Sequence, residues 1–355
     1  MRVGILTSGG DCQALNATMR GLALTLYRNV KDVEIIGFID GYKGLMYEKY
    51  KKMKPKDFYD ILNVGGSILG NSRCPFKRMR IIENGFDKVK AMKNTYKKLE
   101  LDCLVVLGGN GSIKSANMLS QEGLNVIALP KTIDNDAWGT DYTFGYSSAT
   151  AIATRYLDEI KTTAASHSRV FVIEVMGHKV GHICLSAGIA AGADVILLPE
   201  IPYDIKVVAK KVKETLKNEK NYAIIACAEG AISEADALMK RKDYKAKVLA
   251  RNGRSVAYEV ADELSQEIDA EIRVSCIGHA QRGGNPDSYD CEISTRFGVE
   301  GARLIIKKHY GEYVVLQGNH VTHIPLEATA GKLKYVDTEG EIVQSAKLVG
   351  ISFGE

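Results

Sequence analysis

Two glycine-rich stretches have the composition of phosphate-binding loops. SGGD (residues 8–11) and GGNGS (residues 108–112) each directly follow a short apolar run. Glycine lets the backbone approach a ligand and point its N–H groups at it, and a helix that begins just afterwards adds partial positive charge. Neither stretch has the GxGxxG or Walker spacing, and each alone is compatible with a plain tight turn. Two of them in one chain favour a nucleotide or polyphosphate site.

The segment PKTIDND (residues 130–136) carries two carboxylates close together after an apolar run. One of Asp134 and Asp136 can accept a proton while the other holds a metal ion. Lys131 beside them can neutralise phosphate charge or keep the aspartates ionised. The alternative interpretation is an Asx-turn and helix cap without any chemical role.

Basic residues gather in two further segments. Arg273, His279 and Arg282 flank a pair of glycines, and Arg169 stands just before an apolar run. Guanidinium groups bind phosphate through paired N–H donors, so this set is typical of a sugar-phosphate clamp. A structural histidine and a surface arginine are the alternatives.

Short apolar runs alternate with helical patterns around these segments, which predicts βαβ units, parallel sheets and an α/β fold. The runs are nearly continuously apolar, as in strands that are buried on both faces. Ligands of such sheets bind outside the carboxyl ends of the strands, where the glycines and polar residues stand here. The predicted strands are residues 3–6, 33–39, 104–107, 126–129, 170–175 and 222–228, and helices are predicted at 14–27 and from 113 onward.

The composition is that of an ordinary globular protein. At about 150 residues per domain, a chain of 355 residues makes about two domains. Apolar residues are 45% and charged residues 25% of the chain, which excludes intrinsic disorder. Lys plus Arg is 47 and Asp plus Glu is 43, so the net charge of +4 gives no argument for nucleic-acid binding.

Features that would place the chain outside the cytoplasm are absent from the sequence. No apolar run is long enough to span a membrane, and the N-terminus does not resemble a signal peptide. The 7 cysteines form no CxxC pair, so free thiols in a reducing cytoplasm are expected. The most charged tract, residues 240–254, is expected to be a solvated helix and loop, with a phosphate-effector or oligomer contact as the alternative.

Eight motifs along nearly the whole chain together carry a family resemblance. They are SGGDxxxLN (8–16), GGSILGNSR (65–73), GGNGS (108–112), PKTIDND (130–136), SHSRVFVIEVMGH (166–178), AGADVILLPE (191–200), AEG (228–230) and GHAQRGGNPDSYD (278–290). With these motifs the sequence resembles the bacterial-type 6-phosphofructokinases. Its C-terminal extension is similar to that of the mixed-donor branch, whose members use either ATP or pyrophosphate.

The resemblance implies two Rossmann-like parallel-sheet domains with the active site in the cleft between them. Residues 1–140 with a return helix near 285–308 would form the donor domain. Residues 141–284 and about 309–355 would form the sugar-phosphate domain. The implied reaction transfers a phosphoryl group from the donor to the 1-hydroxyl of fructose 6-phosphate, with Mg²⁺ as cofactor. Family members assemble as homodimers or homotetramers, in which residues matching Arg169 and Arg273 reach a neighbouring site.

The resemblance also assigns roles to single residues of this sequence. Asp134 matches the general base, Thr132 a substrate and transition-state contact, and Asp136 with Asn110 the metal site. The donor site would consist of Gly10, Arg73, Cys74, Gly109, Asn110, Gly111, Ser112 and Lys131. The sugar phosphate would contact Thr132, Asp134, Arg169, Met176, Gly177, His178, Glu229, Arg273, His279 and Arg282.

Some residues depart from the family pattern. Asn110 stands where the family usually has a metal-binding aspartate, which predicts weaker Mg²⁺ binding. His178 stands where many members have arginine, which makes a permanent charge titratable. Gln13 and Ala14 replace the usual Pro-Gly, which can alter the loop near the donor.

The choice of donor depends on two positions, Gly111 and Lys131. Gly111 leaves space for a nucleotide, whereas Lys131 is typical of pyrophosphate users, so ATP is favoured and pyrophosphate is the alternative. A different sugar-phosphate acceptor, or a paralogue with weak activity, remains open.

Overall fold

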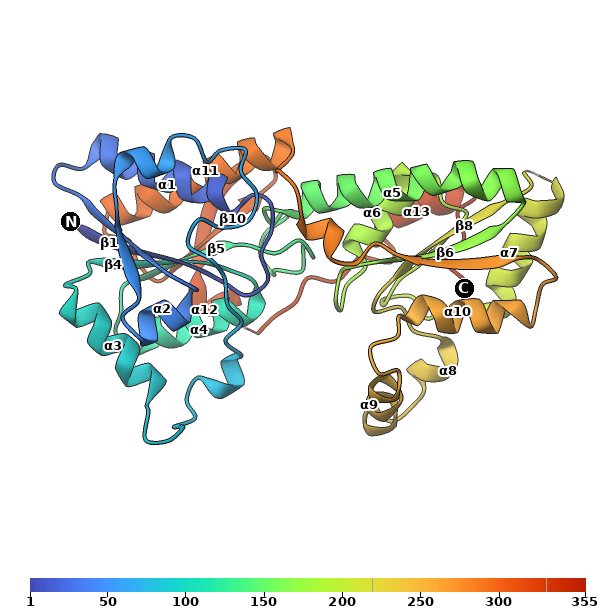
Figure 1. The fold of residues 1–355 in the computed structure, drawn as a ribbon, viewed down its shortest axis with the longest axis horizontal. Helices are drawn as coiled ribbons and strands as arrows, with labels where there is room; N and C mark the ends of the chain where they lie inside the picture. Colours follow the sequence, from blue (N-terminus) through green and yellow to red (C-terminus); the bar gives the residue numbers. More distant parts are fainter. Residues whose placement is uncertain (219, 330) are drawn as a thin grey trace. The chain divides into compact units, whose positions relative to one another are not determined.

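The computed structural model describes residues 1–218, 220–329 and 331–355. The chain forms two compact units, the first from Met1–Ser148 and Arg282–Lys334, the second from Ala149–Gln281 and Tyr335–Glu355 (Figure 1). Each unit is built around its own sheet, so the expected α/β class is confirmed.

A seven-stranded sheet in the order β11-β10-β5-β4-β1-β2-β3 forms the centre of the first unit. The neighbours among β10, β5, β4, β1 and β2 are parallel, whereas β3 and β11 are antiparallel edge strands. The expected parallel sheet is thus mixed at both edges. Its strands are β1 (Arg2–Ser8), β2 (Glu34–Phe38), β3 (Tyr50–Met53), β4 (Cys103–Gly108), β5 (Val126–Pro130), β10 (Glu312–Gln317) and β11 (His320–Pro325).

The boundary between the units differs from the one expected from the sequence. Residues 309–334 belong to the first unit, not to the second. The reason is strand pairing: β10 pairs with β5, with Tyr313 opposite Ala128. β11 then returns beside β10 after a two-residue turn, the loop length that suits an antiparallel hairpin.

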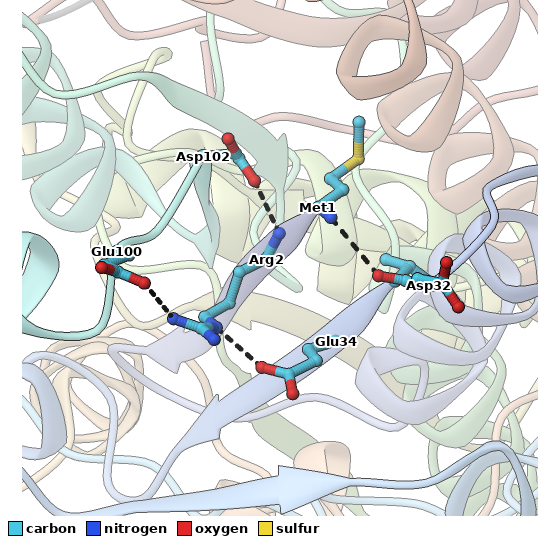
Figure 2. Close-up of a pocket in the computed structure, with 7 residues that line it drawn as sticks. Met1, Arg2, Asp32, Glu34, Glu100 and Asp102 are labelled. Carbon is cyan, nitrogen blue, oxygen red and sulfur yellow. Dashed lines mark hydrogen bonds and ion pairs between the residues drawn. The ribbon is translucent and has the colours of Figure 1, made fainter.

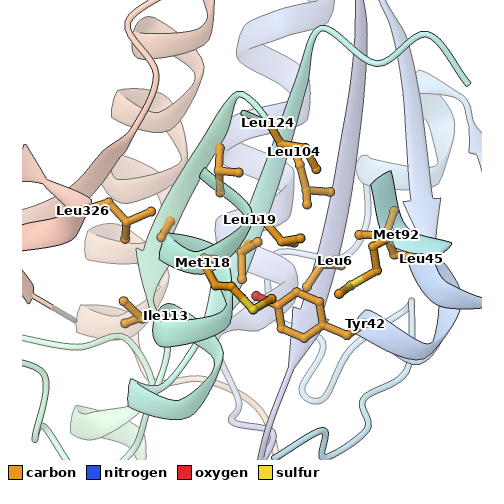
Figure 3. Packing of buried hydrophobic residues seen from close by; sticks show 14 of the residues in the cluster. Leu6, Tyr42, Leu45, Met92, Leu104, Ile113, Met118, Leu119, Leu124 and Leu326 are labelled. Atoms are coloured by element: carbon orange, nitrogen blue, oxygen red, sulfur yellow. The ribbon is translucent and has the colours of Figure 1, made fainter. Parts of the chain in front are cut away.

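Helices cover the sheet of the first unit. They are α1 (Leu15–Asn29), α2 (Tyr42–Met46), α3 (Lys88–Lys98), α4 (Asn110–Gln121), α11 (Ser288–Ile306) and α12 (Leu326–Thr329), with short 3₁₀ turns at Pro55–Phe58 and Phe76–Arg78. Buried Leu6 and Leu104 of the sheet pack with Ile113 and Leu119 of α4 and with Met92 of α3 (Figure 3). This core holds α4, and therefore the glycine stretch at its start, against the sheet.

The return helix α11 packs closely against α1, and glycines permit the contact. A Cβ atom on Gly298 would lie 2.3 Å from the Thr18 carbonyl oxygen, and one on Gly21 would lie 2.6 Å from that of Thr295. Both distances are far below van der Waals contact, so only glycine allows the two backbones to approach this closely.

A parallel four-stranded sheet in the order β7-β8-β6-β9 forms the centre of the second unit. Its strands are β6 (Val170–Val175), β7 (Val195–Leu197), β8 (Ala223–Ala228) and β9 (Ile272–Cys276). Its helices are α5 (Tyr146–His167), α6 (His182–Ala190), α7 (Ile205–Asn218), α8 (Glu234–Ala237), α9 (Arg241–Ala250), α10 (Val256–Ser265) and α13 (Glu341–Leu348), and a 3₁₀ turn covers Gly278–Arg282. Val172, Ile225 and Val260 lie in the core of this unit.

The charged tract is a surface helix, as expected. α9 has no buried residue and lies beside α8 and α10 (Figure 1). Lys247 forms an ion pair with Asp236, and Arg251 forms a bidentate ion pair with Glu259. These contacts attach one side of α9 to its neighbours.

The cysteines are free, as the sequence predicted, although Cys276 is exposed. Within the described ranges, no helix has the length and apolar character needed to cross a bilayer.

Candidate active site

Three segments meet at the carboxyl edge of the first sheet. Ser8, Gly108 and Pro130, which end β1, β4 and β5, stand side by side in the strand register. The Ser112 hydroxyl donates to the Ser8 hydroxyl at 3.0 Å, and the Lys131 ammonium donates to the Gly10 carbonyl oxygen. The two glycine stretches and the TIDND segment are therefore neighbours, although about 120 residues separate the first from the last.

The second glycine stretch opens a helix. Gly109 is the N-cap of α4, which begins at Asn110 and is 12 residues long. Free N–H groups and the helix dipole at such a terminus attract anions. An added Cβ at Gly111 would meet nothing within 4 Å, so space is open beside the first turn.

Arg282 lies against the first glycine stretch. Its Nη1 atom donates to the Asp11 carbonyl oxygen at 2.9 Å, and a Cβ on Gly10 would lie 2.7 Å from the same nitrogen. The guanidinium therefore supplies positive charge at the loop, and Gly10 provides the room for it.

The TIDND segment is held rigidly by its own side chains. The Thr132 hydroxyl accepts a bond of 3.1 Å from the Asp134 amide, while Ile133 is fully buried. Asn135 has a φ of 53°, and its side-chain oxygen accepts from the Thr143 amide at 3.1 Å. Ile133 and Asn135 thus anchor the segment on both sides of Asp134. The next helix after this segment is α5, which begins only at Tyr146, so the segment is a turn but not a helix cap.

Lys131 is a buried cation beneath the loops, with a residue exposure of 2%. The pKa of Lys131 is lowered to about 8, mainly by burial and also by the charge of Arg282, while Cys12, Asp11 and Asp134 act in the opposite direction. A phosphate placed nearby would stabilise the protonated form.

Asn110 and Asp136 are in direct contact. Asn110 Nδ2 donates to Asp136 Oδ2 at 2.6 Å, and Asp136 is only 7% exposed. Across the described ranges, no group of three or more His, Cys, Asp or Glu side chains is arranged to hold a metal. Carboxylate and amide oxygens nevertheless suit Mg²⁺, which commonly takes its remaining ligands from phosphates and water.

A pocket of about 230 Å³ adjoins Arg73 and Cys74. Tyr47, one of its lining residues, stacks on Phe86 with ring centroids 5.1 Å apart. The other lining residues are Lys43, Met46, Pro75, Arg78, Met79, Glu83 and Lys88. Four basic side chains with one acid make this pocket suitable for a ring that carries phosphates.

A larger hollow of about 570 Å³ lies near the start of β1 (Figure 2). Three of its acidic side chains are already paired: Arg2 bonds Glu34 at 2.7 Å and Glu100 at 3.2 Å, and the Arg2 amide bonds Asp102 at 2.7 Å. It stands at the amino edge of the sheet, away from the glycine stretches, and offers no grouping for phosphate chemistry.

The carboxyl edge of the second sheet gathers other predicted residues. Met176, Gly177 and His178 follow β6, and Glu229 follows β8. The Glu229 carboxylate accepts from the Gly177 amide at 3.3 Å and also from the His178 amide. The exposed His178 has a φ of 54°, and His279, which follows β9, is also exposed.

Arg169 and Arg273 lie at the opposite edge of the same sheet. Arg169 precedes β6, and Arg273 is the second residue of β9. A strand of six residues is about 20 Å long, so these arginines are far from His178, Glu229 and His279 of the same chain. The structure therefore separates the expected cluster of Arg273, His279 and Arg282, and Arg282 belongs to the first unit.

Sequence reasoning missed several residues that shape these loops. Thr143 supports TIDND through a bond of 2.7 Å to the Thr132 carbonyl oxygen. The Lys334 amide bonds the Asp136 carbonyl oxygen at 2.9 Å. Glu271 bonds both arginines of the amino edge. None stands in a glycine-rich or otherwise distinctive motif, and only the folded chain brings them to the site.

The chain has two α/β units, and the glycine stretches at the carboxyl edge of the first sheet are typical of proteins that bind phosphate groups. Comparison with known proteins points to the same class. Residues 2–305 match the phosphofructokinase family. The chain is 46% identical to an ATP-dependent 6-phosphofructokinase of Spirochaeta thermophila, over 99% of this chain and 97% of that protein. It is 42% identical to ATP-dependent 6-phosphofructokinase 3 of Bacteroides thetaiotaomicron over the full length of both.

A solved structure is similar as well. Phosphofructokinase from Pichia pastoris superposes with a TM-score of 0.80 at 28% identity, over 93% of this chain and 35% of that chain. The chain belongs to the phosphofructokinase family, which confirms the resemblance seen in its motifs.

Proposed function

We propose that the protein is an ATP-dependent 6-phosphofructokinase, which transfers the γ-phosphoryl group of ATP to the 1-hydroxyl of fructose 6-phosphate in cytoplasmic glycolysis. The observation that carries this is the meeting of both glycine stretches and TIDND at one sheet edge. The similar curated relatives have this activity in their names.

The donor would bind to the first unit. The N–H groups of Gly109, Asn110 and Gly111 at the start of α4 would bind a phosphate of the donor with favourable polarity, and the Ser112 side chain stands in the same turn. Lys131 and Arg282 add positive charge beneath and beside the loops. The pocket at Arg73 and Cys74 is the proposed place of the nucleoside.

Asp134 is the proposed general base. Its backbone is fixed by the Thr132 hydroxyl and by the anchoring of Ile133 and Asn135 on both sides. A carboxylate held in one position can take the proton of the attacking hydroxyl without first losing conformational freedom. The Thr132 side chain belongs to the same turn and is proposed to contact the substrate.

Mg²⁺ would be held by Asp136 and by the side-chain oxygen of Asn110, together with oxygens of the donor. It would neutralise phosphate charge during transfer. As the site stands, the Asn110 amide group donates to Asp136 and so keeps this carboxylate in place.

The sugar phosphate would be bound by residues of the second unit. Glu229 orients the loop of Met176, Gly177 and His178 through two backbone N–H groups, and His279 follows the adjoining strand. Arg169 and Arg273 stand at the other edge of that sheet, so we propose that they serve the site of a neighbouring subunit in a homodimer or homotetramer.

ATP is the proposed donor because of Gly111. An added Cβ there would meet nothing within 4 Å, which leaves room for the part of a nucleotide that pyrophosphate lacks.

A direct assay tests the function. Purified full-length protein is given ATP or pyrophosphate with fructose 6-phosphate or sedoheptulose 7-phosphate, and Asp134→Asn is the control. ATP-dependent formation of fructose 1,6-bisphosphate is expected, and loss of the base should lower kcat by about 10²–10⁴-fold. Faster turnover with pyrophosphate or with the seven-carbon sugar would contradict the proposal, and inactivity of the wild type with every pair would indicate a paralogue without this activity.

A further inference from the structure

Arg169 and Arg273 share one counter-charge, the carboxylate of Glu271. Arg169 Nε lies 2.9 Å from Glu271 Oε2, and the Arg273 guanidinium contacts Glu271 Oε1. β6 and β9 are parallel with Val170 opposite Ile272, so residues 169 and 271 face each other where the two strands begin. The strand register therefore places the carboxylate between the two guanidinium groups.

This arrangement engages Arg169 through Nε and Arg273 through Nη2 before any ligand arrives. Guanidinium groups bind carboxylates and phosphates through the same N–H donors. A phosphate that enters between Arg169 and Arg273 competes with Glu271 for these two donors. The Glu271 and Arg273 side chains are 41% and 51% exposed, so a soluble anion can reach them without unfolding of the chain.

The charges favour replacement of the Glu271 carboxylate by a phosphate. Hydrogen bonds and charge from Arg169, followed by Arg273, lower the pKa of the Glu271 carboxyl, which is therefore ionised at neutral pH. Two guanidinium groups and one carboxylate leave one positive charge. A dianionic phosphate matches both guanidinium groups in charge, whereas the carboxylate matches only one.

We propose that Glu271 is an internal competitor that occupies the phosphate position of Arg169 and Arg273 and thereby weakens their binding of a sugar phosphate. The inference rests on the proposed function, because that function gives these arginines a sugar phosphate as ligand. Glu271 touches no substrate in this scheme and is a positioning residue. Its carboxylate holds the two guanidinium groups together and leaves when the phosphate enters.

Inorganic phosphate is the probe, titrated calorimetrically into the full-length chain without any donor. Glu271→Gln should lower the Kd for phosphate by about threefold to tenfold, as expected for the loss of two competing exposed ion pairs. Glu271→Asp, which keeps the charge, should bind with a Kd between those of Glu271→Gln and the wild type. Glu159→Gln is the matched control, because Glu159 forms an exposed pair of 2.8 Å with Arg155 on α5, and it should leave the Kd unchanged.

The arginine variants show whether the phosphate binds at this place. Arg169→Ala and Arg273→Ala should each raise the Kd for phosphate, and in Glu271→Gln the KM for fructose 6-phosphate should fall while the KM for ATP stays constant. An unchanged or raised Kd in Glu271→Gln, or arginine variants that bind phosphate like the wild type, would overturn the inference. A wild-type chain that fails to phosphorylate fructose 6-phosphate would refute the proposed function, and the phosphate titration would still decide the role of Glu271.

Discussion

Asn110 Nδ2 donates a hydrogen bond of 2.6 Å to Asp136 Oδ2. The neutral amide thus donates to a carboxylate that is only 7% exposed, and a buried carboxylate is stabilised by such a donor. A metal ion can use both side chains only after this bond breaks and the amide turns its oxygen toward the ion.

Asn110→Asp should therefore increase the affinity for Mg²⁺. The substitution places a second carboxylate beside Asp136, and a cation relieves the repulsion between the two. The half-saturating Mg²⁺ concentration for activity should fall at saturating ATP and fructose 6-phosphate. In the absence of substrates, Mg²⁺ should raise the Tm of Asn110→Asp more than that of the wild type. Identical titration curves would leave Asn110 with a role in loop shape only.

Subunit mixing should reveal which chain supplies the arginines. Arg273→Ala alone should have a raised KM for fructose 6-phosphate, since a charge-assisted phosphate contact is lost, whereas the KM for ATP should change little. Asp134→Asn alone should have a kcat lowered by about 10²–10⁴-fold. In a mixed oligomer, a site with Asp134 from one chain and Arg273 from the other is complete. Co-refolding of the two variants should restore activity above the sum of the separate proteins, and a merely additive result would place both residues in the same chain's site.

Lys131 should make stability depend on pH in alkaline solution. Burial lowers its pKa to about 8 in the folded chain, against 10.5 for an ordinary lysine. Below pH 8 both states are protonated, and the folded state bears the full penalty of the buried charge. As pH rises above 8 the folded chain releases the proton first, so this group's contribution to the free energy of unfolding increases.

Lys131→Met removes that contribution. Between pH 7.5 and 9, the free energy of unfolding measured in urea should rise less steeply in the variant, by up to about 1.4 kcal/mol per pH unit. Lys334, whose pKa burial also lowers to about 8, remains in both proteins and cancels in the comparison. Parallel curves would show that Lys131 has an ordinary pKa.

Gly298→Ala should destabilise the first unit. The added methyl group would lie 2.3 Å from the Thr18 carbonyl oxygen and 2.6 Å from the Leu22 amide nitrogen, both backbone atoms that cannot move away singly. This clash should push α1 away from α11. The free energy of unfolding should fall by about 1–3 kcal/mol, as in other overpacked cores.

Gly301→Ala on the same helix is the matched control for this substitution. Its new Cβ would lie 3.1 Å from a Leu22 side-chain carbon, which can rotate. Urea unfolding should show little loss in this control, and a similar loss in both variants would attribute the effect to α11 itself rather than to the contact.

The apolar patterns of the sequence predicted the inner strands except β10 (Glu312–Gln317), where no strand was expected although five of its six residues are buried. Residues 170–175 form β6 as expected, and Val126–Pro130 extends the predicted strand by one residue. Such strands are buried on both faces, and their nearly continuous apolar composition identifies most of them. β9 and β11 escaped prediction because they are edge strands of partly exposed and mixed residues, IRVSC and HVTHIP. The position of β9 depends on pairing with β6, about 100 residues earlier in the chain, which local composition does not contain, whereas β11 pairs with its neighbour β10.

The sequence alone determined the types of residue and the loops in which they stand. Glycines after β1 and β4, and two aspartates after β5, predicted phosphate chemistry because parallel strands place such loops at one edge. Tertiary structure decided the remainder. Arg169 and His178 are close in the sequence, which by itself would allow them to share one site. A strand runs between them, however, and places them at opposite edges of a sheet. Pairing of β6 with β9 then sets Glu271 against Arg169, because strand register brings together residues that are about 100 positions apart.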